Sequence, residues 1–144
     1  MVATAKLASC SLVIDVDVDR KAQAKFEPAP GEHFTGDVMV NHALAAADGS
    51  SNVVLVRFAP GARTHWHSHA AGQYIYVVSG KGRVRSAGEP GTEPVAGDIM
   101  WVPPGETHFH GAAPDSEFVH FAYNGGGAPS WGAEVTDEEY GEGF

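Results

Sequence analysis

Short apolar runs, each broken by polar or turn residues, follow one another along the chain. No long segment repeats its apolar residues with the period of a helix. Residues 14–19 alternate aliphatic and acidic side chains, which is typical of a half-buried strand. We expect residues 11–19 to form an edge strand with Asp15, Asp17 and Asp19 facing water. Acidic side chains discourage open-ended pairing at such an edge, and a strand of this kind suits exchange with a second subunit.

Further strands are predicted where β-branched and aromatic residues lie between glycine and proline turns. They cover residues 53–58, 65–69, 73–78, 83–86, 98–102, 107–110 and 117–123. The Gly-Lys-Gly turn at residues 80–82 predicts that the strands on either side of it pair as a hairpin. A second tight turn is expected at Pro103-Pro104-Gly105. Residues 136–140 are expected to form a short helical turn capped by Thr136, with Glu139 three residues on.

The length and composition favour a single all-β domain. The chain has 144 residues, enough for one hydrophobic core, and its 18 glycines and 9 prolines are too many for a helical bundle. We expect residues 1–33 to form an N-terminal strand and connector. Residues 34–126 would then form a β-barrel, and residues 127–144 a tail packed on it.

Charge and cysteine content narrow the function classes. The formal net charge of −9 gives no electrostatic basis for binding nucleic acid. No apolar run approaches the roughly 20 residues that span a bilayer, so no membrane partner is expected. The single cysteine fits a reducing compartment. Residues 7–10 resemble a lipoprotein cleavage site, but only six residues precede them, too few for a signal peptide. We therefore expect a cytoplasmic protein.

Histidine spacing carries the candidate chemistry. His65, His67 and His69 recur at every second residue, and this spacing on a strand places side chains on one face. His108 and His110 repeat the pattern. Imidazole is the commonest metal ligand among side chains, so the pattern predicts a metal site, to which the nearby Gln73 can add an amide oxygen.

Three other histidines are harder to place from the sequence. His65 has the period of an inward residue, but a bulge near Trp66 would turn it outward. His33 and His42 join no cluster, so we interpret them as unrelated to the site.

Two motifs resemble those of the cupin superfamily. The first is Gly61-x5-His67-x-His69-x3-Gln73-x6-Gly80, and the second is Gly97-x5-Pro103-x-Gly105-x2-His108. Gln73 stands where most cupins have Glu, and Ala112 where the second motif usually ends in Asn. The resemblance implies a conical, jelly-roll-like barrel of two antiparallel sheets with little helix.

Residues 34–140 are similar in more detail to the bacterial cupin hydroxynitrile lyases. The similarity includes Trp66-His67-Ser68-His69, Gly72-Gln73 and residues 108–114. It implies one manganese ion held by the positions of His67, His69, Gln73 and His108. It also implies that His110 and His120 are pocket histidines near a small-molecule substrate, and that the protein is a homo-dimer or homo-tetramer. Those enzymes have alanine at the position of His65.

The expected function is a metal-dependent lyase. Gln73 in place of Glu removes one negative ligand charge, so the ion should polarise a bound oxygen more strongly. Mn, Fe, Ni, Zn and Co all suit the mixed ligand set. His110 or His120 would move the proton. Two alternatives stay open: a dioxygenase or isomerase, and a non-catalytic binding module.

Aromatic residues on the predicted strands are candidate pocket walls, together with His65. Strand alternation sends about half of such residues outward or into the core. The aromatic candidates are Trp101, Phe109, Phe118 and Tyr123.

Overall fold

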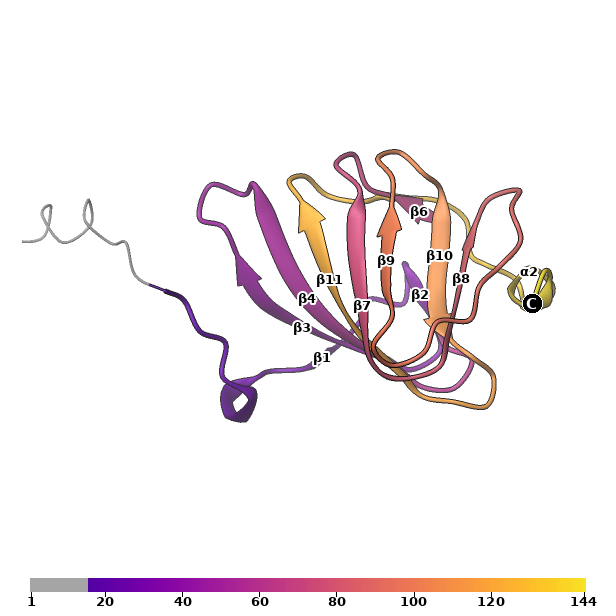
Figure 1. The fold of residues 1–144 in the computed structure, drawn as a ribbon, viewed down its shortest axis with the longest axis horizontal. Coiled ribbons are helices and arrows are strands. Elements are labelled where there is room, and N and C mark those ends of the chain that lie inside the picture. Colours follow the sequence, from indigo (N-terminus) through magenta and orange to yellow (C-terminus); the bar gives the residue numbers. More distant parts are fainter. Residues whose placement is uncertain (1–15) are drawn as a thin grey trace, which may run out of the picture.

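A computed structural model describes residues 16–144 of the chain, except the side chain of Ala22. Two antiparallel sheets curl against each other (Figure 1). The first sheet has six strands in the order β1 (Glu27–Pro28), β3 (Val38–Ala45), β4 (Ser51–Phe58), β11 (Phe118–Gly125), β7 (Gln73–Gly80) and β9 (Ile99–Val102). The predicted all-β class is confirmed.

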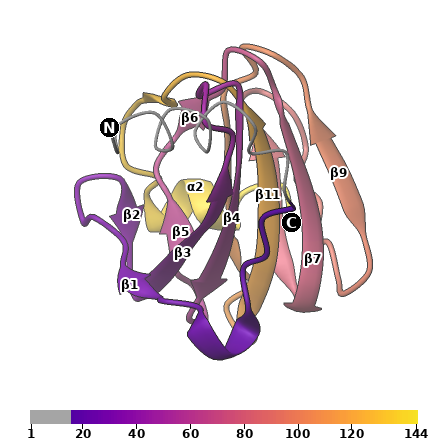
Figure 2. The same cartoon turned by 90° about the vertical axis from the view of Figure 1, so that its left-hand side faces the viewer.

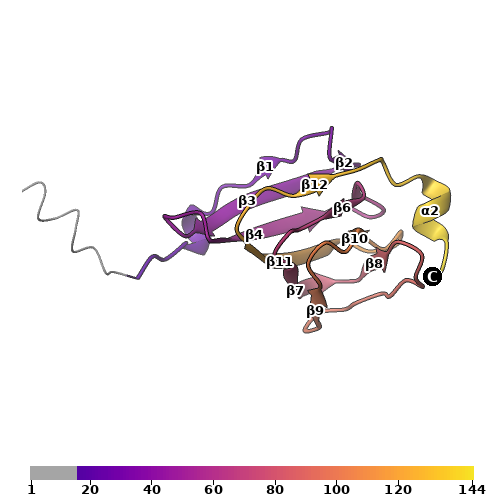
Figure 3. The same ribbon diagram turned by 90° about the horizontal axis from the view of Figure 1, so that it is seen from above.

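The second sheet is built mainly from short strands. Its order is β12 (Ser130–Trp131), β6 (His67–Ser68), β10 (His108–Ala112), β5 (Arg63–Thr64) and β2 (Phe34–Thr35), with β8 (Gly82–Ser86) also pairing with β10. The view from above shows the two sheets facing each other, with helix α2 (Asp137–Gly141) outside one end of the barrel (Figure 3).

Most predicted strands are present, and the helical turn is confirmed together with its cap. The Thr136 hydroxyl accepts from the Glu139 backbone N–H, while the Glu139 carboxylate accepts from the Thr136 backbone N–H. These reciprocal bonds satisfy backbone donors that a helix start leaves open. In the part of the chain that the structure describes, no helix is long and apolar enough to cross a membrane.

Three expectations about the strands need correction. The strands flanking residues 80–82 do not pair as a hairpin, because β8 pairs with β10 in the second sheet while β7 pairs with β9 and β11. Residues 16–20 have no regular secondary structure, and the rest of the predicted edge strand, residues 11–15, lies outside the described residues. Strand β3 was not predicted.

The predicted connector between residues 21 and 32 contains two short elements. A 3₁₀ turn, η1 (Lys21–Gln23), precedes β1, which pairs with β3 at the edge of the first sheet. Seen from its side, the molecule shows this segment leading into the strands of the first sheet (Figure 2).

Apolar side chains close one end of the barrel and leave the other end open to polar residues. Phe58 and Phe118 are fully buried and lie with their ring centroids 6.0 Å apart, surrounded by valines of β3, β4 and β7. The same cluster includes Ala112 of β10, so this packing joins the two sheets. The space between the sheets beyond these rings is therefore available for a site.

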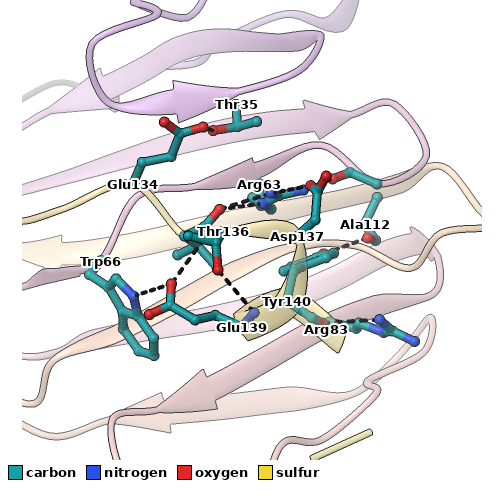
Figure 4. Close-up of polar contacts among 12 residues, drawn as sticks. Thr35, Arg63, Trp66, Arg83, Ala112, Glu134, Thr136, Asp137, Glu139 and Tyr140 are labelled. Carbon is teal, nitrogen blue, oxygen red and sulfur yellow. Dashed lines mark hydrogen bonds and ion pairs between the residues drawn. The ribbon is translucent and has the colours of Figure 1, made fainter. Parts of the chain in front are cut away.

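The C-terminal tail is fastened to the second sheet by polar contacts (Figure 4). The Arg63 guanidinium donates to the Val135 carbonyl at 2.8 and 3.1 Å and pairs with Asp137 at 2.7 Å. The Tyr140 hydroxyl donates to the Ala112 carbonyl, and burial raises the Tyr140 pKa. These contacts hold the segment that carries β12 beside β6.

Candidate metal centre and cavity

A cavity of about 560 Å³ lies between the two sheets. One side of its lining consists of aliphatic residues from β3 and β4, including Val40, Val54 and Val56. The other side carries buried polar groups from both sheets: His67, His69, Gln73, His110, His120 and Asn124. A mostly apolar cavity with a few converging polar groups is the usual form of a small-molecule site.

His67 and His108 lie side by side because β6 and β10 pair directly at these two residues. Their ring centroids are 4.3 Å apart. In each ring, Nδ1 lies 3.0 Å from a backbone carbonyl two residues earlier, that of His65 or Glu106. A carbonyl only accepts, so Nδ1 carries the hydrogen in both rings and Nε2 keeps its lone pair. This is the tautomer in which Nε2 can bind a metal ion.

A backbone hydrogen bond joins the turn at Gly105, in the second motif, to His69 in the first. The Gly105 backbone N–H donates to the carbonyl of His69 at 2.9 Å, and Gly105 has a positive φ of 76° that favours glycine. This hydrogen bond joins the turn that precedes His108 to the segment that carries His69.

The amide of Gln73 is oriented by a chain of hydrogen bonds. Its Nε2 donates to Asn124 Oδ1 at 2.9 Å, and Asn124 Nδ2 donates to Asn52 Oδ1 at 3.0 Å. Gln73 Oε1 consequently lies 3.1 Å from His108 Nε2. Both atoms bear lone pairs and neither carries a hydrogen in the neutral state, so the contact favours a shared cation over a hydrogen bond. The residues present therefore fit a divalent metal ion.

Two further histidines adjoin this pair. The potential ligand nitrogens of His67, His108 and His110 all lie within 4.8 Å of one another, which makes them a three-histidine metal candidate. The His69 ring centroid is 5.1 Å from that of His67, and its Nε2 is buried without a hydrogen-bond partner. The geometry thus brings the four predicted ligands together and adds His110 to their neighbourhood.

Burial lowers the pKa of every histidine in this group. The pKa of His69 falls to about 4 and that of His120 to about 3, mainly because burial penalises the charged imidazolium. Burial, with smaller repulsion from neighbouring histidines, holds the pKa values of His67 and His110 well below the usual range. The imidazoles are consequently neutral near pH 7, as metal ligation requires.

His110 and His120 form a linked pair on the wall of the cavity. His120 Nε2 lies 3.0 Å from His110 Nδ1, and the Phe58 ring packs against both imidazoles. The Thr64 hydroxyl accepts from the backbone N–H of His110, and His110 Nε2 is buried without a partner. The pair is therefore held rigidly, with an outer nitrogen free to meet a substrate.

None of the aromatic residues considered as pocket walls lines this cavity. Strand alternation turns Trp101 and Tyr123 to the outer face of the first sheet, where they are 47% and 43% exposed. Phe109 packs against Trp66 and Tyr140 under the tail, and Phe118 belongs to the core at the closed end. His65 does not line the cavity either, because the chain bends between β5 and β6 and separates it from the strand position of His67.

Among the cavity-wall residues that the sequence analysis did not assign to the site are three with rings: His33, His42 and Trp131. Trp131 faces the site because β12 pairs with β6 at His67. Its ring stacks on His33 at 4.4 Å with an interplanar angle of 7° and lies 4.7 Å from the ring of His67. Only the pairing of segments distant in sequence brings these rings together, and the local pattern gave no signal for it.

Comparisons with known proteins agree with this geometry. Residues 54–122 match the Cupin domain family. An (R)-mandelonitrile lyase from Granulicella tundricola is 37% identical over 133 residues, covering 87% of this chain and 98% of that protein.

Solved structures share the architecture. A cupin-like protein from Thermotoga maritima superposes with a TM-score of 0.78 at 36% identity, covering 90% of this chain and 96% of that one. A polyketide cyclase from Streptomyces resistomycificus, at 16% identity and a TM-score of 0.66, covers 88% of this chain and 91% of that one and shares the fold alone. The predicted barrel and the resemblance noted in the sequence are both confirmed. The chain belongs to the cupin family.

Proposed function

We propose that this protein is a metal-dependent lyase that cleaves a small hydroxynitrile into a carbonyl compound and hydrogen cyanide. The observation that carries the proposal is the 3.1 Å contact between the lone-pair atoms Gln73 Oε1 and His108 Nε2, which lies beside the linked pair His110 and His120. The similarity to an (R)-mandelonitrile lyase supports the same class of reaction.

His67, His69, Gln73 and His108 would hold one divalent ion, with manganese the first expectation and Fe, Ni, Zn and Co as alternatives. When bound, such an ion supplies Lewis-acid polarisation of an oxygen atom. Because all four ligands are neutral, the protein does not offset the charge of the ion at this position. The Asn124–Asn52 relay keeps the Gln73 oxygen directed at the site.

The pair of His110 and His120 is suited to take up a proton and return it. Two neutral imidazoles joined by one hydrogen bond carry one lone pair and one hydrogen on their two outer nitrogens. With the lone pair on His110 Nε2, this atom accepts the hydroxyl proton while the carbon–carbon bond to the nitrile breaks. The electron pair of that bond leaves with cyanide, the oxygen becomes a carbonyl, and cyanide takes the proton. The step needs no oxidant or reductant.

The apolar part of the cavity lining would contact the organic group of the substrate. Val40, Val54, Val56 and Ala122 line the cavity on the first sheet, beside His120, and present an apolar surface to it. Trp131 adds an aromatic surface beside His67. A small organic group attached to the hydroxyl-bearing carbon would bury apolar area there, which contributes about 25 cal/mol per Å².

The test is the release of cyanide from small hydroxynitriles by metal-loaded protein, with His110→Ala and His120→Ala compared with His42→Ala. His42 lines the same cavity but belongs to neither the ligand set nor the pair. We expect the first two variants to lose turnover while keeping metal, and the third to keep both. Full turnover in both His110→Ala and His120→Ala would contradict the proton-transfer role. Oxygen consumption with activity lost under nitrogen would instead indicate a dioxygenase.

A further inference from the structure

The cavity continues past the site of the proposed reaction. His67, one of the proposed metal ligands, has its ring 4.7 Å from that of Trp131, and Trp131 in turn stacks on His33 at 4.4 Å. All three residues line the cavity, so its wall extends beyond His67 by one aromatic ring and ends at His33 on this side. A cavity of about 150 Å³ can hold benzene, and this one measures about 560 Å³. The cavity therefore has room for an organic group that reaches His33.

His33 is held in a fixed position on the wall. Its backbone carbonyl accepts from the His65 N–H at 2.8 Å, and β2, which follows it directly, pairs with β5. One face of its ring lies on Trp131, which is held in turn by the pairing of β12 with β6 and by the Phe34 ring at 5.6 Å. A side chain that is already ordered loses little conformational entropy when a ligand binds to it. His33 is thus preorganised to contact a bound molecule.

The two ring nitrogens of His33 have different surroundings. Nε2 lies 3.7 Å from the carboxylate of Glu32, whose side chain is 77% exposed. Nδ1, by contrast, is buried and has no hydrogen-bond partner in the described chain. The negative charge beside Nε2 favours the neutral ring with its hydrogen on Nε2, so that Nδ1 keeps a lone pair. A buried acceptor without a partner is costly, and a ligand that donates to it removes that cost.

The rest of the lining indicates which kind of group can meet this lone pair. Among the described residues, no Lys, Arg, Asp or Glu lines the cavity. A carboxylate or an ammonium group on the ligand would therefore lose its hydration without gaining a counter-charge near His33. The valines of β3 and β4 suit an apolar spacer. An uncharged hydroxyl group on an apolar spacer meets both conditions, because it donates one hydrogen bond and carries no charge.

We propose that His33 forms a second polar subsite of the cavity, and that the substrates are hydroxynitriles whose organic group carries a hydroxyl of its own. That hydroxyl donates to His33 Nδ1 while the reacting end lies at the histidine pair. The choice of a hydroxynitrile rests on the proposed lyase function, whereas the subsite depends only on His33 and the cavity. Because the subsite lies away from the reacting atoms, His33 sets specificity by binding the ground state and the transition state equally.

The test compares benzyl alcohol with the meta and para isomers of hydroxybenzyl alcohol, which lack a nitrile and cannot undergo the cleavage. Isothermal titration calorimetry gives their dissociation constants for Mn²⁺-loaded wild type, His33→Phe, His33→Leu and His42→Phe. His33→Phe keeps a ring on Trp131 but removes Nδ1, and His42→Phe makes the same change at another histidine of the cavity wall. Two variants of His33 are used so that a folding defect in one, detected by circular dichroism, leaves the other informative.

We expect wild type and His42→Phe to bind at least one hydroxybenzyl alcohol about 3- to 10-fold more tightly than benzyl alcohol, the gain of one net hydrogen bond. This preference should vanish in both His33 variants, while benzyl alcohol itself binds them within about twofold of wild type. Absence of a preference in wild type would overturn the subsite. So would a preference that a folded His33 variant retains.

Cyanide release separates this inference from the proposed function. It is measured with the hydroxynitriles of benzaldehyde and of the meta and para hydroxybenzaldehydes. Cyanide release without a preference that depends on His33 would support the lyase and overturn the subsite. Tighter binding of a hydroxybenzyl alcohol that depends on His33, without cyanide release from any of the three hydroxynitriles, would support the subsite and contradict the lyase.

Discussion

The two faces of one sheet reverse the usual distribution of polar and apolar residues. Toward the barrel interior, β7 and β11 bury Gln73, His120 and Asn124, whereas toward the outside they expose Tyr74 and Tyr123. In most proteins, polar side chains face water and aromatic side chains are buried, which is the reverse of this arrangement. Buried polar groups are retained where a ligand or hydrogen bonds satisfy them, and exposed aromatic rows where a partner covers them. Hydrogen bonds among the cavity residues account for the inner departure, whereas Tyr74 and Tyr123 are 48% and 43% exposed in the described chain.

The largest expected effect separates the two faces of the sheet by substituting two adjacent residues of β7. Ile75 is fully buried, whereas Tyr76 points outward. Ile75→Lys should lower the free energy of unfolding by about 4 kcal/mol or more, because it buries a charge in an apolar core. Tyr76→Lys should change the unfolding free energy of the monomer by less than about 1 kcal/mol. Urea unfolding of both variants at low protein concentration measures the difference, and equal losses would contradict the assignment of the two faces.

The next prediction concerns the inner face alone. His110→Ala should lower kcat by about 10²- to 10⁴-fold, because it removes a general base without touching the Gln73–His108 contact. Metal content should stay within about 20% of the wild-type value, since the four proposed ligands remain. Steady-state kinetics combined with metal analysis of the same sample separates the two effects. Loss of metal together with activity would make His110 a ligand instead, as its place in the three-histidine group allows.

A third prediction follows from the lowered histidine pKa values. His69 and His120 have pKa values of about 4 and 3 in the fold, below the value of about 6.5 in the unfolded chain. The unfolded state therefore binds more protons below pH 6.5, so stability is full above that pH and falls as the pH drops toward 4.

The metal-free protein should show this loss directly. We expect its Tm to fall by roughly 5–10 °C between pH 7 and pH 5, a window above the usual titration range of carboxylates. His120→Phe should reduce the slope, and His42→Ala should leave it unchanged. A Tm that is constant across this range would show that the histidines are not buried in neutral form.

The smallest expected effect concerns His33 and Trp131 on the cavity wall. His33→Phe keeps an aromatic ring against Trp131 but removes Nδ1, a buried atom without a hydrogen-bond partner that belongs to a cavity residue. KM should rise by about 3- to 10-fold with kcat nearly unchanged, because uniform binding energy is lost. Kinetics of His33→Phe beside His33→Gln, which retains a polar group, measure the effect. A 100-fold fall in kcat would place His33 in the reaction itself.

The local pattern predicted the parts of the fold that depend on alternation and turns. The spacing of His65, His67 and His69, and of His108 and His110, was expected to direct side chains to one face. His67, His69, His108 and His110 converge, but His65 does not line the cavity. The capping box of α2 was equally local. A period of two shows that alternate residues share a face of the strand, but it does not show which face lines the cavity. Trp101 and Tyr123 lie on the face that points away from the cavity.

Long-range pairing explains what the sequence left out. The turn at residues 80–82 looked like a hairpin, but it connects the two sheets, so β8 finds its partner in β10. β3 was missed because its residues alternate between buried and exposed over only part of its length. A register shift between His42 and Leu44 interrupts its pairing with β4. Trp131 enters the site only through the pairing of β12 with β6. No local pattern encodes these contacts.

The most direct test of the central claim is the metal content of untagged protein, measured by elemental analysis for wild type, His67→Ala and His42→Ala. Both histidines line the cavity, but only His67 presents an oriented Nε2 beside His108. The account predicts about one divalent ion per chain in wild type and His42→Ala, with manganese expected, and at least a tenfold lower content in His67→Ala. Equal metal content in all three proteins, or none in the wild type after reconstitution, would contradict it.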